Sequence, residues 1–212
     1  MYLPEPFRDD DRANLLSLCR TRPFGTVIAH DPSAGLEISH LPFLVREAAG
    51  ALSVFGHVAR GNRLGRLAEA GARMTAVVHG PHAYVSPRWY ETPTEQVPTW
   101  NYMVAHLEGP SRATSVAELE SLLDELSRSH EEGADDPWSV DLLAPELASD
   151  LRRALVGICI RVERISCKAK LSQNRSEEDR ARVVRALRER GSPDDLELVA
   201  RMTRDPQSER TT

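Results

Sequence analysis

Two lysines stand almost side by side in the segment CKAKLSQNR, and they are the only lysines in the chain. Lys168 and Lys170 are two of 27 basic residues, and all the others are arginine. A lysine ammonium is a compact point charge, whereas the arginine guanidinium is a planar fork, so the two are not interchangeable. A phosphate or carboxylate suits such a charge, and Ser172, Gln173 and Asn174 add short polar groups beside it. The segment is a candidate anion site; the alternative is a solvated strand end in a chain that has drifted towards arginine.

A histidine and a possible anion clamp lie close together in the segment GHVARGN. His57 alternates with apolar residues, and Arg60 and Asn62 follow at the predicted junction of a strand and a helix. Backbone N–H groups and a guanidinium at such a junction can hold an anion. A single well-placed imidazole is also sufficient to bind haem iron. The alternative is a surface histidine followed by a solvated arginine.

Other catalytic centres find no support in the sequence. The seven histidines show no zinc-type spacing, and no serine stands in a GxSxG turn. A zinc site and a catalytic triad are therefore not predicted, and no catalytic residue is identified. Much of the aromatic content instead lies between residues 80 and 102. Clustered aromatic rings beside prolines can form a rigid wall for a planar cofactor, or fold as a loop over a core.

Composition and charge narrow the classes of function. The net charge of −5, from 27 basic and 32 acidic residues, argues against general binding of nucleic acid. No apolar run reaches the length of about 18 residues that a membrane span requires. The N-terminus lacks the basic start and apolar core of a signal peptide, and the three cysteines lack metal-type spacing. We therefore expect a cytoplasmic protein with reduced thiols that does not enter a membrane.

The elements that must position these residues are mainly strands, followed by helices. Strands are predicted at 24–29, 36–45, 51–59, 73–79, 82–86 and 99–107, and a long one runs from 156 into CKAKL. Helices are predicted at 9–21, 62–70 and 145–155, and after Ser115, Ser176 and Ser192. Ser115 and Glu118 form a capping box. Gly80-Pro81 is predicted to be a turn, and the strand over 99–107 is predicted to end at Gly109-Pro110.

This order of elements predicts an α+β fold, most simply a small antiparallel barrel with inserted and C-terminal helices. We expect one cofactor-binding domain over 1–175 and a helical extension packed on it over 176–204. A flexible tail is expected over 205–212. No glycine-rich phosphate loop follows a strand, so a nucleotide-binding βαβ fold is not expected.

The succession PFGTVIAH, SHLPF, GHVARGN, GPHAYVSPRWY, VPTWNY and KLSQNR resembles the PaiB family from the N-terminus to about Leu187. Its members are flavin-binding split-barrel proteins described as negative transcriptional regulators. The resemblance implies a six-stranded antiparallel split β-barrel and a homodimer with the cofactor pocket where two barrels meet. Direct binding of nucleic acid is not expected, because the charge is negative and no helix-turn-helix pattern is evident.

Two departures from the family pattern bear on the cofactor. The run after His57 reads HVARGNRL where the family usually has HLARANPQW. After SPRWY, Glu91-Thr92-Pro93 replaces the usual serine and lysine. Piperazate synthases resemble PaiB proteins but use haem b to close N-hydroxylated ornithine into a ring by forming an N–N bond. We therefore expect a haem-dependent cyclase of this kind; the alternative is an FMN-binding regulator or flavin reductase.

The resemblance implies the same pocket residues for either cofactor. Under the haem hypothesis His57 is the axial ligand of the iron, with His40, His79 and His82 as rivals. The aromatic rings would wall the cofactor, and the cations would pair with its anionic groups or with a small-molecule substrate. The residues expected to bind the cofactor are His57, Arg60, Asn62, Ser86, Arg88, Trp89, Tyr90, Thr99, Trp100, Asn101, Lys170, Ser172 and Gln173.

Overall fold

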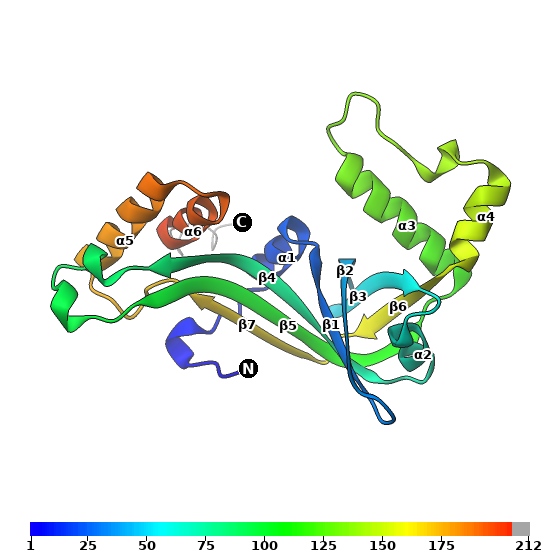
Figure 1. The fold of residues 1–212 in the computed structure, drawn as a ribbon, viewed down its shortest axis with the longest axis horizontal. Coiled ribbons are helices and arrows are strands. Elements are labelled where there is room, and N and C mark those ends of the chain that lie inside the picture. Colours follow the sequence, from blue (N-terminus) through cyan, green and yellow to red (C-terminus); the bar gives the residue numbers. More distant parts are fainter. Residues whose placement is uncertain (205–212) are drawn as a thin grey trace. The chain divides into compact units, whose positions relative to one another are not determined.

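A computed structural model describes residues 1–204 of the chain (Figure 1). The tail predicted at 205–212 lies outside the described residues. The strands are β1 (Phe24–Asp31), β2 (Gly35–Ala48), β3 (Ala51–Ala59), β4 (Arg73–Val85), β5 (Thr99–Ala113), β6 (Leu155–Arg161) and β7 (Arg164–Lys170). The helices are α1 (Arg12–Thr21), α2 (Arg63–Glu69), α3 (Val116–Glu131), α4 (Pro145–Arg153), α5 (Glu177–Arg190) and α6 (Pro193–Thr203).

The strands form a ring. Their order is β4-β1-β2-β3-β6-β5-β7, and β4 also pairs with β5, so six strands close on themselves while β7 extends from β5. The pairs β1–β2, β1–β4, β2–β3, β3–β6 and β5–β6 are antiparallel. This topology confirms the predicted fold class, an antiparallel split barrel with inserted and C-terminal helices.

The chain divides into two compact units, and β4 and β5 contribute residues to both. The first unit comprises Met1–Asp11, His79–Ala105 and the residues from Ser166 onwards. The second unit comprises Arg12–Val78 and His106–Ile165. The C-terminal helices fall in the same unit as β7, and the expected division after residue 175 stays a prediction.

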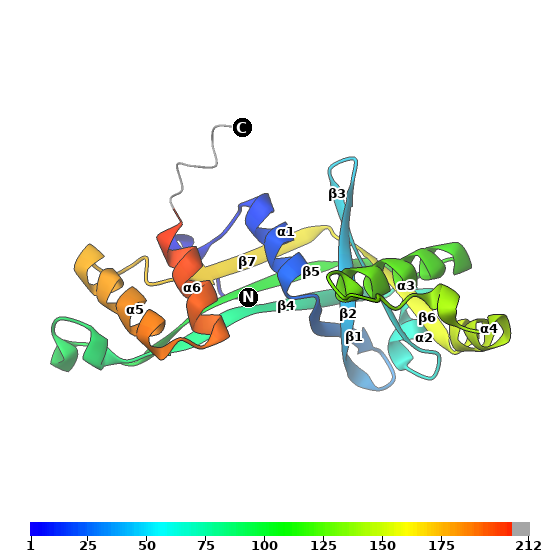
Figure 2. The same cartoon turned by 90° about the horizontal axis from the view of Figure 1, so that it is seen from above.

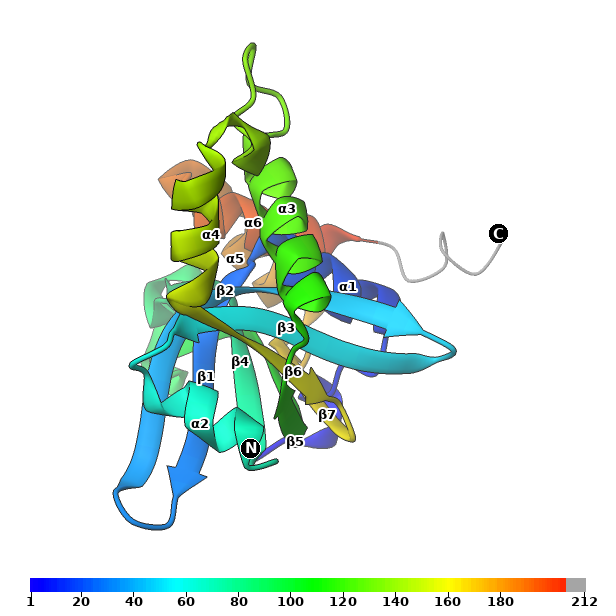
Figure 3. The ribbon, with the colours of Figure 1, turned by 90° about the vertical axis from the view of Figure 1, so that its right-hand side faces the viewer.

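In the second unit the alternation of β3 sorts its side chains onto two faces. Leu52, Val54 and Val58 are buried on one face, as the sequence pattern predicted. On the other face Phe55 is also buried, because Leu122 and Leu126 of α3 pack against it together with Cys159. Figure 3 shows α3 and α4 beside β3 and β6. The capping box of Ser115 and Glu118 is confirmed and begins α3.

In the first unit, two helices cover one face of the strands. Figure 2 shows α5 and α6 lying over β4, β5 and β7. Their buried side chains, which include Val183, Leu187 and Leu198, pack against Ala83, Met103 and Ala169 of the three strands. Gly191, with a φ of 70°, ends α5 as predicted, and Ser192 begins α6 with a capping box. No helix in the described chain is long and apolar enough to cross a membrane.

Three sequence predictions of strand ends were wrong. Gly80-Pro81 lies inside β4 and Gly109-Pro110 lies inside β5, so neither pair forms a turn. Gly109 allows the backbone near Arg161 to approach β5 closely, because a Cβ added at Gly109 would lie 1.8 Å from the carbonyl oxygen of Arg161. The long strand predicted from 156 into CKAKL is two strands, β6 and β7, interrupted at Val162 and Glu163.

Candidate functional site

The face of β4, β5 and β7 that turns away from α5 and α6 carries aromatic and cationic side chains. We call it the aromatic–lysine face, formed by His82, Tyr84, Trp100, Tyr102, Lys168 and Lys170. Along each strand these residues alternate with the buried residues that pack against α5 and α6. Because successive side chains of a strand point to opposite faces, the six residues lie on one face. Trp100 is 51% exposed and Tyr84 is 40% exposed. Such exposed aromatic rings are unusual unless they meet a ligand or a partner.

Trp100 is the centre of the aromatic part of this face. Its ring centroid lies 6.1 Å from that of His82 and 6.0 Å from that of Tyr84, which meets it edge-on. A groove of about 560 Å³ is lined by His79, Gly80, His82, Trp100, Tyr102, Met103 and Val104. Its largely apolar wall with a few polar groups is suited to a flat molecule.

The two lysines extend the same face and are flanked by aromatic rings. Lys168 Nζ lies 5.4 Å from the ring centroid of Tyr102 and 5.7 Å from that of Tyr2, whose carbonyl oxygen accepts its hydrogen bond at 3.2 Å. Lys170 Nζ donates to Thr99 Oγ1 and lies 5.9 Å from the ring centroid of Phe7. In Figure 1 the N-terminal segment runs on the side of these strands opposite to α5 and α6.

In the described chain no acidic side chain forms an ion pair with either lysine. Within residues 1–204 the hydrogen-bond partners of both ammonium groups are neutral oxygens. Burial lowers the pKa of Lys170, and the positive charges of Lys168 and Arg175 lower it further, whereas Tyr102 raises it. Two like charges held together without a counter-charge favour the binding of an anion.

The motifs PTWNY and KLSQNR are joined by buried hydrogen bonds between Asn101 and Ser172. Asn101 is completely buried, and its Nδ2 donates to Ser172 Oγ at 3.0 Å while Ser172 Oγ donates back to Asn101 Oδ1 at 3.2 Å. Gln173 folds back on the chain: its Oε1 accepts from Leu171 N at 2.6 Å and its Nε2 donates to Ala169 O at 2.5 Å. These three predicted cofactor residues use their polar groups to hold the end of β7.

The residues from 86 to 90 are likewise engaged by the protein. Ser86 caps a short 3-10 helix, Pro87–Trp89, by accepting from the backbone N–H of Arg88 at 3.3 Å. Tyr90 is 2% exposed and belongs to the core under α5 and α6, against which Trp89 also packs. Of this group, the side chain of Arg88 is the exposed one.

In the second unit, His57 lies half-buried on β3. Its Nδ1 is buried and has no hydrogen-bond partner in the described part of the chain. Burial lowers the pKa of the imidazole. A neutral imidazole carries one N–H and one free lone pair, which is the form that binds a metal or accepts a proton.

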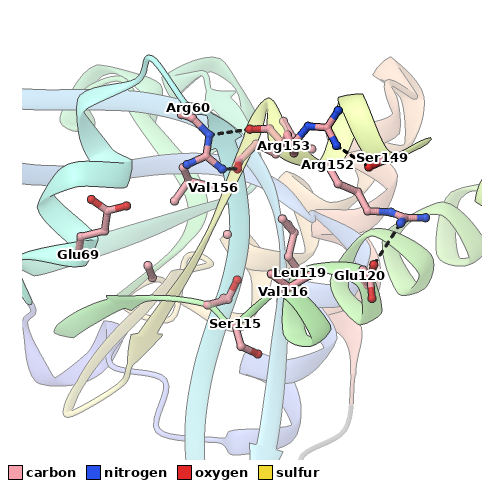
Figure 4. A pocket seen from close by; sticks show the side chains of 14 residues that line it. Arg60, Glu69, Ser115, Val116, Leu119, Glu120, Ser149, Arg152, Arg153 and Val156 are labelled. Carbon is pink, nitrogen blue, oxygen red and sulfur yellow. Dashed lines mark hydrogen bonds and ion pairs between the residues drawn. The ribbon is translucent and has the colours of Figure 1, made fainter. Parts of the chain in front are cut away.

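Arg60 and Asn62 hold the junction that follows His57. Arg60 donates from Nε to the carbonyl oxygen of Arg153 at 2.5 Å and from Nη2 to that of Leu155 at 2.9 Å. It borders a pocket of about 400 Å³ beside the first turn of α3 (Figure 4). Asn62 Oδ1 accepts from Leu64 N at 2.9 Å and caps α2, while its Nδ2 donates to Ser39 Oγ at 2.9 Å.

The structure thus distributes the predicted residues over the two units. His57, Arg60 and Asn62 belong to the second unit, and all the others belong to the first. No sequence pattern connects Tyr2 and Phe7 with the lysines, because about 160 residues separate them along the chain. Among residues 1–204 no cluster of three histidine, cysteine or acidic side chains is suited to a metal ion. The three cysteines, Cys19, Cys159 and Cys167, are buried and form no disulfide in the described chain.

The lowered pKa of His57 predicts a pH-dependent stability. Because its folded pKa lies below that of the unfolded chain, near 6.5, the unfolded state binds more protons as the pH falls. The unfolding free energy should therefore decrease from about pH 7 to about pH 5. In His57→Gln this decrease should be smaller, as measured by urea unfolding at each pH. Equal slopes for the parent and the variant would show that His57 does not contribute.

Residues 1–164 match the family model described as "Putative FMN-binding domain". The chain is also similar to the protease synthase and sporulation protein PAI 2 of Bacillus subtilis (strain 168). The two are 32% identical over 202 residues, which cover 95% of this chain and 96% of the relative.

Solved structures with a similar fold include two proteins whose titles name cofactors. One is the FAD and heme binding protein from Mycobacterium smegmatis, with a TM-score of 0.59 and 17% identity over 82% of this chain and 78% of the other. The other is the flavocytochrome Anf3 from Azotobacter vinelandii, with a TM-score of 0.56 and 16% identity over 82% and 75%. At these identities the likeness concerns the fold alone. The family match and the full-length similarity to the Bacillus protein show that the chain belongs to the PaiB-like family of FMN-binding-domain proteins.

Proposed function

We propose that this chain is a flavin-binding redox protein that holds FMN on the aromatic–lysine face. The observation that carries the proposal is the pair of lysines, which have no acidic partner within residues 1–204, beside the exposed aromatic rings of Tyr84 and Trp100. FMN combines a flat ring system with a phosphate, and this face offers both kinds of contact. The family description supports the same cofactor.

Different residues of the chain would bind the phosphate and the ring system of the cofactor. Lys168 and Lys170 would neutralise the phosphate through charge-assisted hydrogen bonds. Trp100 and Tyr102 would contact the flat ring and exclude water from it. A bound flavin would supply electron or hydride transfer to a small-molecule substrate. The donors present therefore fit the cofactor.

We also propose a homodimer with the cofactor pocket at its interface, as the family resemblance implies. Trp100 and Tyr84 remain substantially exposed in one chain, at 51% and 40%. A second copy would cover such a surface and complete a closed pocket. Light scattering on the purified protein measures its mass, and a monomer would contradict this part of the proposal.

A second candidate is the haem-dependent ring closure expected from the departures in the sequence. The observation in its favour is His57, whose pKa is lowered by burial and whose Nδ1 has no hydrogen-bond partner in the described part of the chain. Histidine binds haem iron through one ring nitrogen, so His57 would be the axial ligand of haem b. The iron would supply activation of the hydroxylamine N–O bond of N-hydroxylated ornithine.

Absorption spectroscopy of the purified and reconstituted protein distinguishes these candidates. The protein is titrated separately with FMN and with haem, and His57→Ala is titrated in parallel. We expect FMN to bind with quenched fluorescence in both proteins. A Soret band that appears with haem in the parent and is lost in His57→Ala would favour the second candidate. If neither cofactor binds, the chain is a cofactor-free scaffold and both candidates fail.

A further inference from the structure

Three residues on neighbouring segments of the second unit form a row across the sheet. His57 on β3 lies directly opposite Gly157 on β6. Thr114 follows β5 immediately, and its backbone N–H donates to the carbonyl oxygen of Gly157 at 2.9 Å. The register of β5 with β6, in which Ala113 faces Ile158, places Thr114 opposite Gly157 as well. Residues directly opposite each other present their side chains on the same face.

The absence of a side chain on Gly157 leaves a gap in this row. A Cβ added to Gly157 would lie 2.1 Å from Thr114 Oγ1 and 3.1 Å from Thr114 Cβ. The Thr114 hydroxyl therefore occupies the space above the glycine. Adjacent strands are about 4.8 Å apart, so His57 stands on the side of Gly157 opposite to Thr114, on the same face of the sheet.

The two side chains that flank Gly157 in this row each carry one polar atom without a partner within residues 1–204. In the part of the chain that the structure describes, His57 Nδ1 and Thr114 Oγ1 are buried without a hydrogen bond. A buried polar atom without a partner destabilises the folded state. Both atoms are shielded from solvent. A direct hydrogen bond between the two would satisfy both at once, and because they are unpaired here it requires a rotation of one of the side chains.

We propose that Thr114 is a positioning residue for His57: its hydroxyl accepts a hydrogen bond from Nδ1–H across Gly157 and fixes the imidazole. This bond places the ring proton on Nδ1 and leaves the lone pair on Nε2. An imidazole with a free Nε2 can bind a metal or accept a proton, and its second nitrogen is held by a partner. The pairing does not depend on which cofactor the protein binds.

Nitrogen-15 NMR of the His57 ring at neutral pH tests the proposal without any cofactor. Thr114→Val removes the hydroxyl but keeps the branched shape, and Thr114→Ser keeps the hydroxyl. We expect the parent and Thr114→Ser to show one tautomer with the proton on Nδ1. Thr114→Val should lose this single tautomer and show a mixture with protonated Nε2.

Two further readouts separate positioning from a loss of structure. The amide spectrum of Thr114→Val should keep the dispersion of the parent, which shows that the fold is intact. Gly157→Ala fills the gap and should also produce the tautomer mixture, since it displaces the Thr114 hydroxyl. The proposal is overturned if the parent carries its proton on Nε2, or if folded Thr114→Val keeps the parent's tautomer. Failure of FMN or haem to bind would leave this result unaffected.

Discussion

Replacing Gly109 with alanine is expected to destabilise the protein by about 3 kcal/mol. The new Cβ would lie 1.8 Å from the carbonyl oxygen of Arg161 and 2.8 Å from its carbonyl carbon. Both atoms belong to the backbone and cannot rotate away as a side chain can. The neighbouring hydrogen bond from Glu163 N to Glu108 O, at 2.8 Å, holds the two segments together at this point. The midpoint of thermal unfolding should fall by roughly 6–12 °C.

Gly61→Ala provides the matched control for this substitution. A Cβ added to Gly61 meets no heavy atom within 4 Å, and its backbone does not require glycine. The control should unfold at about the temperature of the parent. Equal midpoints for the two variants would mean that the approach of β5 to residues 161–163 is looser than the structure shows.

The sequence predicted the elements whose signals are local. The capping box of Ser115 and Glu118 and the glycine that ends α5 lie within a few residues of the feature that they determine. The alternation of β3 was equally readable, because one face of the strand is buried in the core. Such signals are sufficient to locate helices and strands, although several ends shift by a few residues.

The sequence failed where a residue serves a distant contact. Gly109-Pro110 has the composition of a turn, but Gly109 is needed because another segment passes close to it. Asn101 and Ser172 stand in motifs that suggest a binding site, yet their polar groups bond to each other. Composition cannot distinguish a polar residue that meets a ligand from one that ties two segments together.

For the lysine pair, in contrast, an unusual composition drew attention to residues that lie together in the structure. Lys168 and Lys170 stood out only as ammonium groups in an arginine-rich chain. The structure adds that both lie on one strand face, beside aromatic rings from the N-terminal segment. Lys168 places a compact cation between the rings of Tyr2 and Tyr102.

Substitution of the lysines is expected to weaken FMN binding strongly. A hydrogen bond to a charged group contributes about 1.5–3 kcal/mol, so Lys170→Met should raise the Kd of FMN by about 10–100-fold. The double variant with Lys168→Met should weaken binding further, because the phosphate would lose both cations. Fluorescence quenching at one fixed salt concentration measures each Kd, since screening changes the contribution of charges.

Arg185→Met combined with Arg188→Met is the control for net charge. Both arginines are exposed on α5, so this variant loses the same charge as the double lysine variant but away from the aromatic–lysine face. It should bind FMN as the parent does. If both double variants lose affinity equally, the effect reflects the overall field of the protein. If the lysine variant binds FMN as tightly as the parent, the phosphate lies elsewhere and the proposed site is wrong. Lys168→Arg then asks whether charge alone is sufficient: a folded variant with weakened FMN binding would show that this position requires an ammonium.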